Sequence, residues 1–493
     1  MQRRHLQGPR GGLALLTAVA FPAIAAARPE PPPPRIDMPA VYALPGPGAW
    51  LPAAALDQWW RLFADRTLDA LEDEASRAAP DALTAAARIV EARATSAAQR
   101  AATLPSGSLT GNASHQRAYA IGIPANDLNP TSGVTETATG NFNVSWELDL
   151  FGRLAQARRV ARADAAEARF NVEGTRASLA ANVADAYFQA QGLVVQVDDA
   201  RQTARIERDL LSVARRKAAA GAGPSDDIDR VAGQSAQAAA QATDLQAQLD
   251  DARRRLLILV GRDLRDLDEL ALTGVTPEIP PAPDALPSQL LSRRPDIRAA
   301  EFRLRAALGA ARLAHLAIFP TVTLLPGLGA SSVSAPGVSY IPPTTLVASQ
   351  QVTTVGFWTL GAGISVPVLD IPRLLHQARA EDARALEAAI AYQNTVRTAF
   401  GEAQTSLTDL AAGERAVALL ADGEVRARNA YQGARRGYAQ GLDDLTTTLG
   451  AEQSWRSIRS SLTAERVDSL RRAVRSYKAL GGGWAFAGAA GGG

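Results

Sequence analysis

Acidic side chains gather beside two glycine-containing breaks in otherwise helical sequence. They are Asp226, Asp227 and Asp229 after Gly221, and Asp443 and Asp444 after Gly441. If several copies of the chain brought these carboxylates together, the resulting ring would attract cations and influence ion selectivity. Aspartates at the start of a helix also cap free N–H groups and stabilise the helix dipole. The sequence is compatible with both roles.

Basic and aromatic residues precede the second break. Arg435, Arg436 and Tyr438 lie just before Gly441, and they could tether one helix end to another through contacts with neighbouring acids. The alternative is an ordinary helix end, where arginines interact with free carbonyl groups. The candidate gate residues are therefore Asp226, Asp227, Asp443, Asp444, Arg435 and Tyr438.

The sequence contains no recognisable catalytic constellation. It has no phosphate-binding glycine loop followed by lysine, no G-x-S-x-G elbow and no H-E-x-x-H motif. His115, His315 and His376 lack acidic or thiol partners at ligand spacing, which argues against a metal site. The absence of cysteine excludes disulfides, thiol catalysis, iron–sulfur ligation and a lipid-modified N-terminal cysteine. We therefore expect no enzyme activity, no cofactor and no bound metal.

Charge and the N-terminus indicate an exported protein. Residues 1–27 have the pattern of a secretory signal peptide, in which three arginines precede an apolar run and Ala25 and Ala27 form an A-x-A cleavage site. Loss of those arginines changes the formal net charge from +2 to −1, which does not favour nucleic acid binding. Residues 28–55 are rich in proline and are predicted to form an extended arm.

Two pairs of segments alternate between apolar and polar residues, as membrane-crossing strands do. No apolar run of about 20 residues follows the signal, so a membrane would have to be crossed by strands. The two pairs lie at about 107–150 and 319–368. Trp146 and Trp358 occupy matching strands, and they are candidates for an aromatic girdle or for a buried contact with helices.

Long helices follow each strand pair. Residues 153–220 contain no proline, and a helix of that length would span roughly 100 Å. A return helix is predicted at 225–260. After a proline-rich linker at 271–294, a helix begins at Pro295 within SRRPDI, which we interpret as a structural helix start. The second strand pair is then followed by a long helix at 372–438, a return helix at 442–480 and a flexible tail at 481–493.

The two halves of the chain share one plan. A shift of about 220 residues superposes matching landmarks: Ser145 on Ser365, Arg153 on Arg373, Gln156 on His376, Arg216 on Arg436, and Gly221 on Gly441. We interpret residues 56–270 and 295–480 as two copies of one structural unit.

Four membrane-length strands cannot close a barrel by themselves, because about eight strands are the smallest number that packs. Open strand edges are not tolerated in hydrocarbon, so other copies of the chain must complete the barrel. Two, three or four copies would satisfy closure equally well. The long helices would extend the barrel into a tube, with the breaks at Gly221 and Gly441 at its far mouth.

Several motifs resemble the outer-membrane efflux proteins of tripartite pumps, in the branch called the nodulation-protein T type. They are WWRLFADRTLDAL (59–71), SWELDLFGRLAQARRVARADAAEA (145–168), ANVADAYF (181–188), LPSQLLSRRPDIRAAEFRLRAALGAARLAHLAIFP (286–320) and GYAQGLDDL (437–445). The resemblance implies an α+β membrane protein, a homotrimer whose chains each give four strands to a twelve-stranded outer-membrane β-barrel. It also implies a helical periplasmic barrel, a periplasmic adaptor protein, an inner-membrane efflux pump and contact with outer-membrane lipid.

Three features depart from the family pattern. Many relatives carry a lipid on a cysteine after the signal, whereas this chain would depend on its barrel alone for attachment. The segment that usually reads FDGGR is LDIPR (369–373) here, so Pro372 begins the helix differently. After GLDDL, Gly450 stands where the family often has an aspartate, so one element of a constricted entrance is missing.

The sequence therefore predicts a passive outer-membrane channel through which an inner-membrane pump expels small molecules, such as drugs, organic compounds or metal ions. One alternative is an outer-membrane duct for type I protein secretion. Another is a soluble periplasmic coiled-coil scaffold. Exposed apolar strand faces argue against the scaffold, because they would need another apolar cover.

Overall fold

The computed structural model describes residues 56–118, 133–220, 225–262, 270, 272–274, 277–281, 287–341, 345–440 and 442–484. The predicted signal peptide at 1–27 and the proline-rich arm at 28–55 lie outside the described residues. The same is true of Gly221 and Gly441, although the helices on both sides of each break are described.

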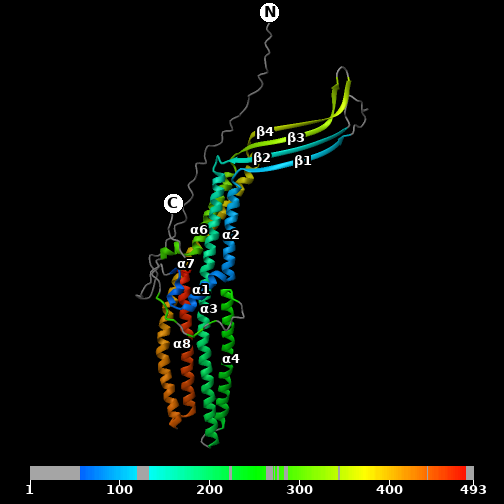
Figure 1. Cartoon of the computed structure of the whole chain (residues 1–493). Helices are drawn as coiled ribbons and strands as arrows, with labels where there is room; N and C mark the ends of the chain where they lie inside the picture. The colour runs from blue at the N-terminus through cyan, green and yellow to red at the C-terminus, as the bar shows by residue number, and fades with distance from the viewer. Residues whose placement is uncertain are drawn as a thin grey trace. The chain divides into compact units, whose positions relative to one another are not determined.

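Four strands form one antiparallel sheet in the order β1-β2-β3-β4 (Figure 1). They are β1 (Ser106–Ala118), β2 (Gly133–Leu148), β3 (Thr321–Ile341) and β4 (Thr345–Ser365). The second pair is longer than the strands expected at 319–333 and 354–368, because β3 and β4 remain paired as far as Ile341 opposite Thr345. Apolar alternation is lost in that part, but the backbone hydrogen bonds of an antiparallel ladder do not depend on it.

The register places apolar side chains on one face of the sheet. Leu109, Phe142, Leu328 and Trp358 stand opposite one another in a row across the four strands, and all are exposed. The opposite face carries hydroxyl and amide side chains on β1 and β2, among them Ser108, Thr110, Asn112, Thr139, Asn141 and Asn143. On β3 and β4 it also carries the exposed apolar residues Leu325, Val355 and Phe357. Within the described strands, Glu147 is the only charged residue on this polar face. One apolar and one polar face are the pattern of a barrel wall between lipid and water.

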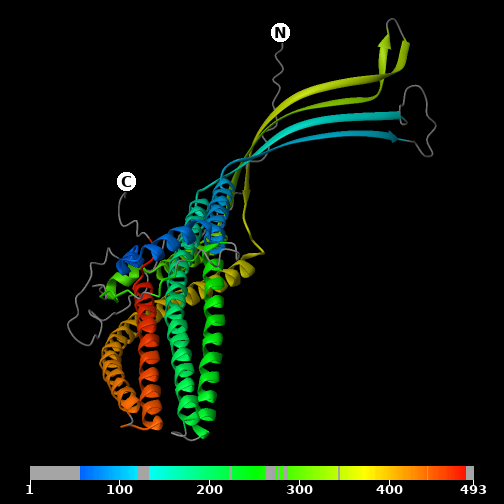
Figure 2. The ribbon, with the colours of Figure 1, turned by 60° about the horizontal axis from the view of Figure 1, so that its bottom comes forward.

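Two long helices follow the strand pairs, and each is paired with a shorter return helix. α3 (Arg153–Ala219) has 67 residues and α7 (Ile371–Gln440) has 70, while α4 (Asp226–Val260) and α8 (Leu445–Ala479) have 35 each. Figures 1 and 2 show α4 alongside α3 and α8 alongside α7. We call these pairs the α3–α4 hairpin and the α7–α8 hairpin. They are the duplicated unit of the chain.

Local contacts determine where the long helices begin. Gly152 has a φ of 79°, a left-handed conformation that favours glycine. The carboxylate of Asp149 accepts hydrogen bonds from the backbone N–H groups of Leu154 at 2.9 Å and Ala155 at 2.8 Å. In the second half, α7 begins one residue before Pro372. A proline in the first helical turn lacks only an N–H group that would be unpaired there anyway.

Shorter helices complete the fold. They are η2 (Trp59–Phe63), α1 (Arg66–Ala78), α2 (Pro80–Ala101), η4 (Pro287–Gln289), α5 (Leu290–Arg293) and α6 (Pro295–Leu316). The segment expected to be a linker at 271–294 therefore becomes helical from Pro287 onward. Asp65 caps α1 by accepting hydrogen bonds from the N–H groups of Thr67 at 2.9 Å and Leu68 at 3.2 Å. No helix in the described ranges combines the length and the apolar character that a membrane span requires.

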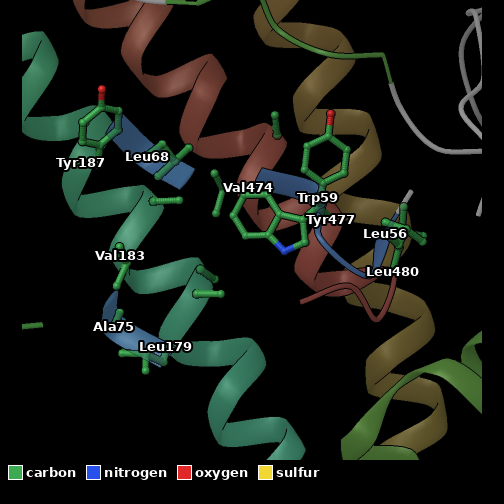
Figure 3. Close-up of a cluster of buried hydrophobic side chains, with 14 of the residues drawn as sticks. Leu56, Trp59, Leu68, Ala75, Leu179, Val183, Tyr187, Val474, Tyr477 and Leu480 are labelled. Carbon is green, nitrogen blue, oxygen red and sulfur yellow. The ribbon is translucent and has the colours of Figure 1, made fainter. Parts of the chain in front are cut away.

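The main hydrophobic core joins the N-terminal helices to α3 and α8 (Figure 3). Trp59 and Tyr477 are buried at its centre, where their rings stack with centroids 5.8 Å apart. The buried hydroxyl groups have partners: Tyr187 donates to Asp65 over 2.7 Å, and Tyr477 donates to the carbonyl of Pro280 over 2.9 Å. Desolvation raises the pKa of both tyrosines, so both stay neutral.

The end of the described chain packs onto the same region. Nε1 of Trp484 donates a hydrogen bond to the carbonyl of Arg293 over 2.9 Å, and its ring meets Phe170 edge-on at 6.1 Å. The expectation of a flexible tail at 481–493 is therefore wrong for residues 481–484, while 485–493 lie outside the described residues. The glycine content suggested flexibility, but a tryptophan that finds an apolar surface orders the chain around it.

Candidate functional site

The first acidic group lies in the first turn of α4. Asp226, Asp227 and Asp229 all occupy this turn, where the positive end of the helix dipole stabilises negative charge. Ser225 precedes the helix but forms no side-chain capping bond. Nη2 of Arg230 donates to Asp227 over 2.8 Å. These aspartates therefore stabilise the start of α4. Their carboxylates also remain at the helix end, where copies from several subunits could form a ring.

The second acidic group caps α8. Oδ1 of Asp444 accepts a hydrogen bond from the backbone N–H of Thr447 at 2.6 Å. That bond lowers the pKa of Asp444, and Arg230 lowers it slightly further. The capping role considered for Asp444 is therefore present in the structure. A cap does not prevent the same carboxylate from contributing to a ring.

Asp443 has a different environment. Its carboxylate lies against Gly437, so closely that a β-carbon on Gly437 would overlap it. The backbone N–H of Leu442 donates to the carbonyl of Gly437 over 2.8 Å and closes the end of α7. Gly437 therefore provides the space that allows Asp443 to fold back over the helix end.

The tips of the two hairpins contact each other within one chain. Nζ of Lys217 lies 3.6 Å from the centre of the Tyr438 ring, and Nη1 of Arg230 donates to the hydroxyl of Thr446 over 3.3 Å. Val231, Leu445 and Leu449 form a small buried cluster, and Tyr438 packs against it. Arg230 thus links the acidic turn of α4 to the start of α8, because it bonds Asp227 and Thr446 and its charge acts on Asp444. The partner of Tyr438 is a lysine rather than the acid that the sequence suggested.

Arg435 and Arg436 are both exposed at the end of α7. In the part of one chain that the structure describes, neither arginine forms an ion pair. Among the described residues of one chain, the suggested contact of Arg435 with an acid is therefore not made.

Sequence reasoning missed Lys217 and Arg230. Lys217 is one of only two lysines in the chain, the other being Lys478, and this rarity was the available signal. Neither residue has a counterpart in the other half, because a shift of about 220 residues places both on glycines, Gly437 and Gly450. The comparison of the two halves therefore gave no indication of their role.

The two candidate girdle residues share a face but not a level. Trp146 stands opposite Leu324, which pairs with Ala362, whereas Trp358 pairs with Leu328. The difference of four residues corresponds to about 13 Å along a strand. Both side chains are exposed. A single girdle at one height would therefore not include both tryptophans.

Two histidines have acidic neighbours after all. Nδ1 of His115 lies 3.1 Å from Glu136 across β1 and β2, and Nε2 of His315 lies 3.0 Å from Asp382. These partners are distant in sequence, which is why spacing alone did not reveal them. His376 is exposed. Among the described residues, no three potential metal ligands come together.

A four-stranded sheet with one apolar face, followed by paired long helices in a duplicated unit, defines one subunit of an outer-membrane channel. The sequence matches the model of the outer membrane efflux protein family over residues 71–262 and 286–482. The chain belongs to the outer membrane efflux protein family.

Similar proteins agree with this assignment. The chain is 28% identical over 473 residues to the pyoverdine export outer membrane protein OpmQ of Pseudomonas putida, which covers 95% of this chain and 97% of that protein. It is 28% identical over 445 residues to the toluene efflux pump outer membrane protein TtgC of Pseudomonas putida, with 87% and 86% covered.

Solved structures show the same fold. The outer-membrane channel OprN superposes with a TM-score of 0.75 at 26% identity, over 92% of this chain and 99% of that chain. The CmeC outer membrane channel of Campylobacter jejuni gives 0.76 at 21% identity, over 92% and 95%.

The predicted fold class is confirmed: this is an α+β protein with the fold of trimeric outer-membrane efflux channels. It is an outer-membrane efflux protein with a periplasmic helical extension. The soluble scaffold is thereby excluded.

Proposed function

We propose that the assembled channel is a passive conduit for small molecules, loaded by a periplasmic adaptor protein and an inner-membrane efflux pump. The chain would perform no reaction of its own. Relatives named for the export of pyoverdine and toluene support small-molecule cargo over the alternative of type I protein secretion. Deletion of the gene should raise the cellular accumulation of small organic compounds. Unchanged accumulation, with loss of a secreted polypeptide from the medium, would favour the alternative.

The two faces of the sheet carry this proposal. β1 and β4 are the outer strands of the four-stranded sheet, and four strands are too few to close, so neighbouring copies would pair with these edges. Three copies supply twelve strands, with the Leu109–Phe142–Leu328–Trp358 row toward lipid and the polar face toward a water-filled lumen.

Adjacent residues on opposite faces provide a sharp test. Leu109→Arg would place a charge against lipid at a cost of about 2–4 kcal/mol, and it should prevent assembly in the outer membrane. Thr110→Arg, one residue further on, would place the same charge in the lumen and should assemble normally. Membrane fractionation of both variants measures the difference. Equal recovery of the two variants in the outer membrane would contradict the assigned faces.

We further propose that the hairpin tips form the periplasmic mouth, with Asp226, Asp227, Asp443 and Asp444 repeated in each subunit as a ring of negative charge. The exposed position of Arg435 suits a contact with an acid of a neighbouring subunit. Lys217 and Tyr438 would hold the two tips of each chain together in the narrow state.

Charge neutralisation tests the ring without removing the helix cap. Asn caps a helix about as well as Asp, so Asp443→Asn with Asp444→Asn should preserve α8 while it lowers cation selectivity in planar bilayers. Asp250→Asn with Asp251→Asn removes the same charge further along α4, where Arg253 and Arg254 pair with these acids. If the tip variant and this control have the wild-type selectivity, the tips do not form the selective ring.

A further inference from the structure

A pair of buried carboxyl groups lies between the two hairpins. Glu207 on α3 and Glu452 on α8 are both 0% exposed. One guanidinium group serves both. Nη2 of Arg456 lies 2.6 Å from Glu207, while its Nε lies 3.7 Å from Glu452. Two acids from opposite hairpins therefore compete for a single positive charge.

Most of the carboxyl oxygens in this pair have no hydrogen-bond donor among the described residues. These are Oε2 of Glu207 and both oxygens of Glu452. Two ionised carboxylates beside one guanidinium would leave an uncompensated negative charge out of contact with water, which is strongly unfavourable. One additional positive charge would remove this excess.

The additional charge has to be very small. A polar groove of about 440 Å³ runs between α3, α4 and α8, and its wall contains Glu207 and Arg456 but not Glu452. The Glu452 carboxyl thus lies behind the wall of the groove, where a hydrated cation or an amine has no access. A proton can reach it.

The other charged groups near Glu207 and Glu452 are either engaged with other partners or too distant to neutralise the second carboxylate. Glu424 of α7 accepts a hydrogen bond from Trp455 over 2.8 Å, and Arg459 of α8 is paired with Asp199 of α3. Arg435 of α7 acts on Glu452 only through its charge. Tyr431 of α7 stacks on Trp455. The α4 residues that line the groove are uncharged, and Oε1 of one of them, Gln234, also lacks a donor.

We propose that Glu452, buried opposite Glu207, holds a proton in the contact of α3 with α8, here called the hairpin seam, and that loss of this proton loosens the seam. Burial raises the pKa of Glu452 to about 7; Arg456 opposes this rise, Glu207 adds to it, and Arg435 opposes it. The exchange would occur near neutral pH, within the range that a periplasm open to its surroundings experiences.

The direction of the effect follows from the raised pKa. The packed seam binds the proton more tightly than a separated seam, where the carboxyl group would have its usual pKa of 4.5. The stabilisation is therefore complete below that value, and it is lost as the pH rises through about 7. Within this window, each pH unit changes the ratio of packed to separated seam by up to about tenfold. An effect of this proton on transport would rest on the proposed function of the hairpin tips as the mouth. The proton site itself does not depend on that proposal.

Hydrogen exchange of the assembled protein measures the seam directly. Peptides around 203–212 and 448–458 are compared with a peptide from the buried part of α6 around 297–306, outside the seam. This comparison corrects for the intrinsic pH dependence of exchange. The measured quantity is the exchange rate of the seam peptides divided by that of the reference peptide. Between about pH 5.5 and 8.5, this ratio should rise several-fold in the wild type, with its midpoint near 7. Glu452→Gln, which is neutral at every pH, should keep the ratio low throughout. Glu207→Gln frees Arg456 for Glu452 and should also abolish the rise.

Glu465→Gln is the matched control, because Glu465 is a carboxylate of the same helix that pairs with Arg472 of α8. It should retain the wild-type profile. A flat ratio in the wild type, or an undiminished rise in Glu452→Gln, would overturn the proton site. If the variants do not assemble, the pH profile of the wild type alone still tests whether the proton site exists. Conductance of Glu452→Gln with the wild-type pH dependence would disprove the link to the mouth, and would leave the channel function itself intact.

Discussion

Arg294 donates a hydrogen bond from Nη2 to Oε2 of Glu402 over 2.7 Å, and this contact joins the start of α6 to the middle of α7. The same guanidinium group forms two hydrogen bonds to Asp296, at 3.0 and 2.7 Å. It also donates to the carbonyl of Ala479 at the end of α8, over 3.1 Å. Only 9% of Arg294 is exposed. The SRRPDI segment is therefore more than a helix start, because it holds three helices together.

Arg294→Ala should destabilise the protein by about 2–3 kcal/mol, because a buried, multiply bonded guanidinium is lost and the carbonyl of Ala479 loses a donor. Arg305→Ala is the control. Arg305 is half exposed, pairs with Glu301 one turn away and lies over the Phe302 ring, so its removal should change stability by less than about 1 kcal/mol. Thermal unfolding of the purified variants compares the two. Equal losses would show that Arg294 is not a junction.

Gly192 of α3 allows α3 and α8 to approach each other closely. A β-carbon at this position would overlap a methyl group of Val467 on α8. Gly192→Ala should therefore destabilise the seam by about 1–3 kcal/mol through overpacking. Val467→Ala in the same chain should restore much of that loss. A double-mutant cycle on unfolding free energies measures this coupling, and simple additivity would rule out the close contact.

Lys217 and Tyr438 should contribute to the stability of the joined tips. A partly exposed cation–π pair contributes about 0.5–1 kcal/mol, so Lys217→Ala should raise the population of separated tips by about two- to fivefold. Lys217→Arg and Tyr438→Phe retain the cation and the ring, and both should behave as the wild type. Single-channel recording measures the open fraction. An increase with Lys217→Arg as large as with Lys217→Ala would argue against the pair.

Local sequence was sufficient for the long helices and for the existence of the four strands, because periodicity and capping are properties of neighbouring residues. The duplicated plan came from comparing the two halves of the sequence. The aspartate that begins α8 is an example, since Asp444 caps a backbone N–H only three residues away. The full length of β3 and β4 was less accessible. Their outer part is held by strand pairing, which leaves no apolar pattern in either strand alone.

Much of the candidate site depends on residues that are far apart along the chain. Arg230 and Thr446 are separated by 216 positions, and Arg456 and Glu207 by 249. Nothing in the neighbourhood of Glu452 indicates that a second acid faces the same arginine. Trp484 was hidden for another reason: the glycines around it suggested flexibility more strongly than one aromatic residue suggested order. Contacts of both kinds follow from the packing of the helices.

The polar face of the sheet has a consequence for cargo. Hydroxyl and amide groups can exchange hydrogen bonds with a passing solute, but they provide no deep electrostatic well for either sign of charge. Glu147, the only charged residue on this face within the described strands, is engaged by Arg153. Cationic, anionic and zwitterionic solutes would thus experience similar friction along this wall. Along the described strands, a compound that has passed the helices would therefore meet little further selection by charge.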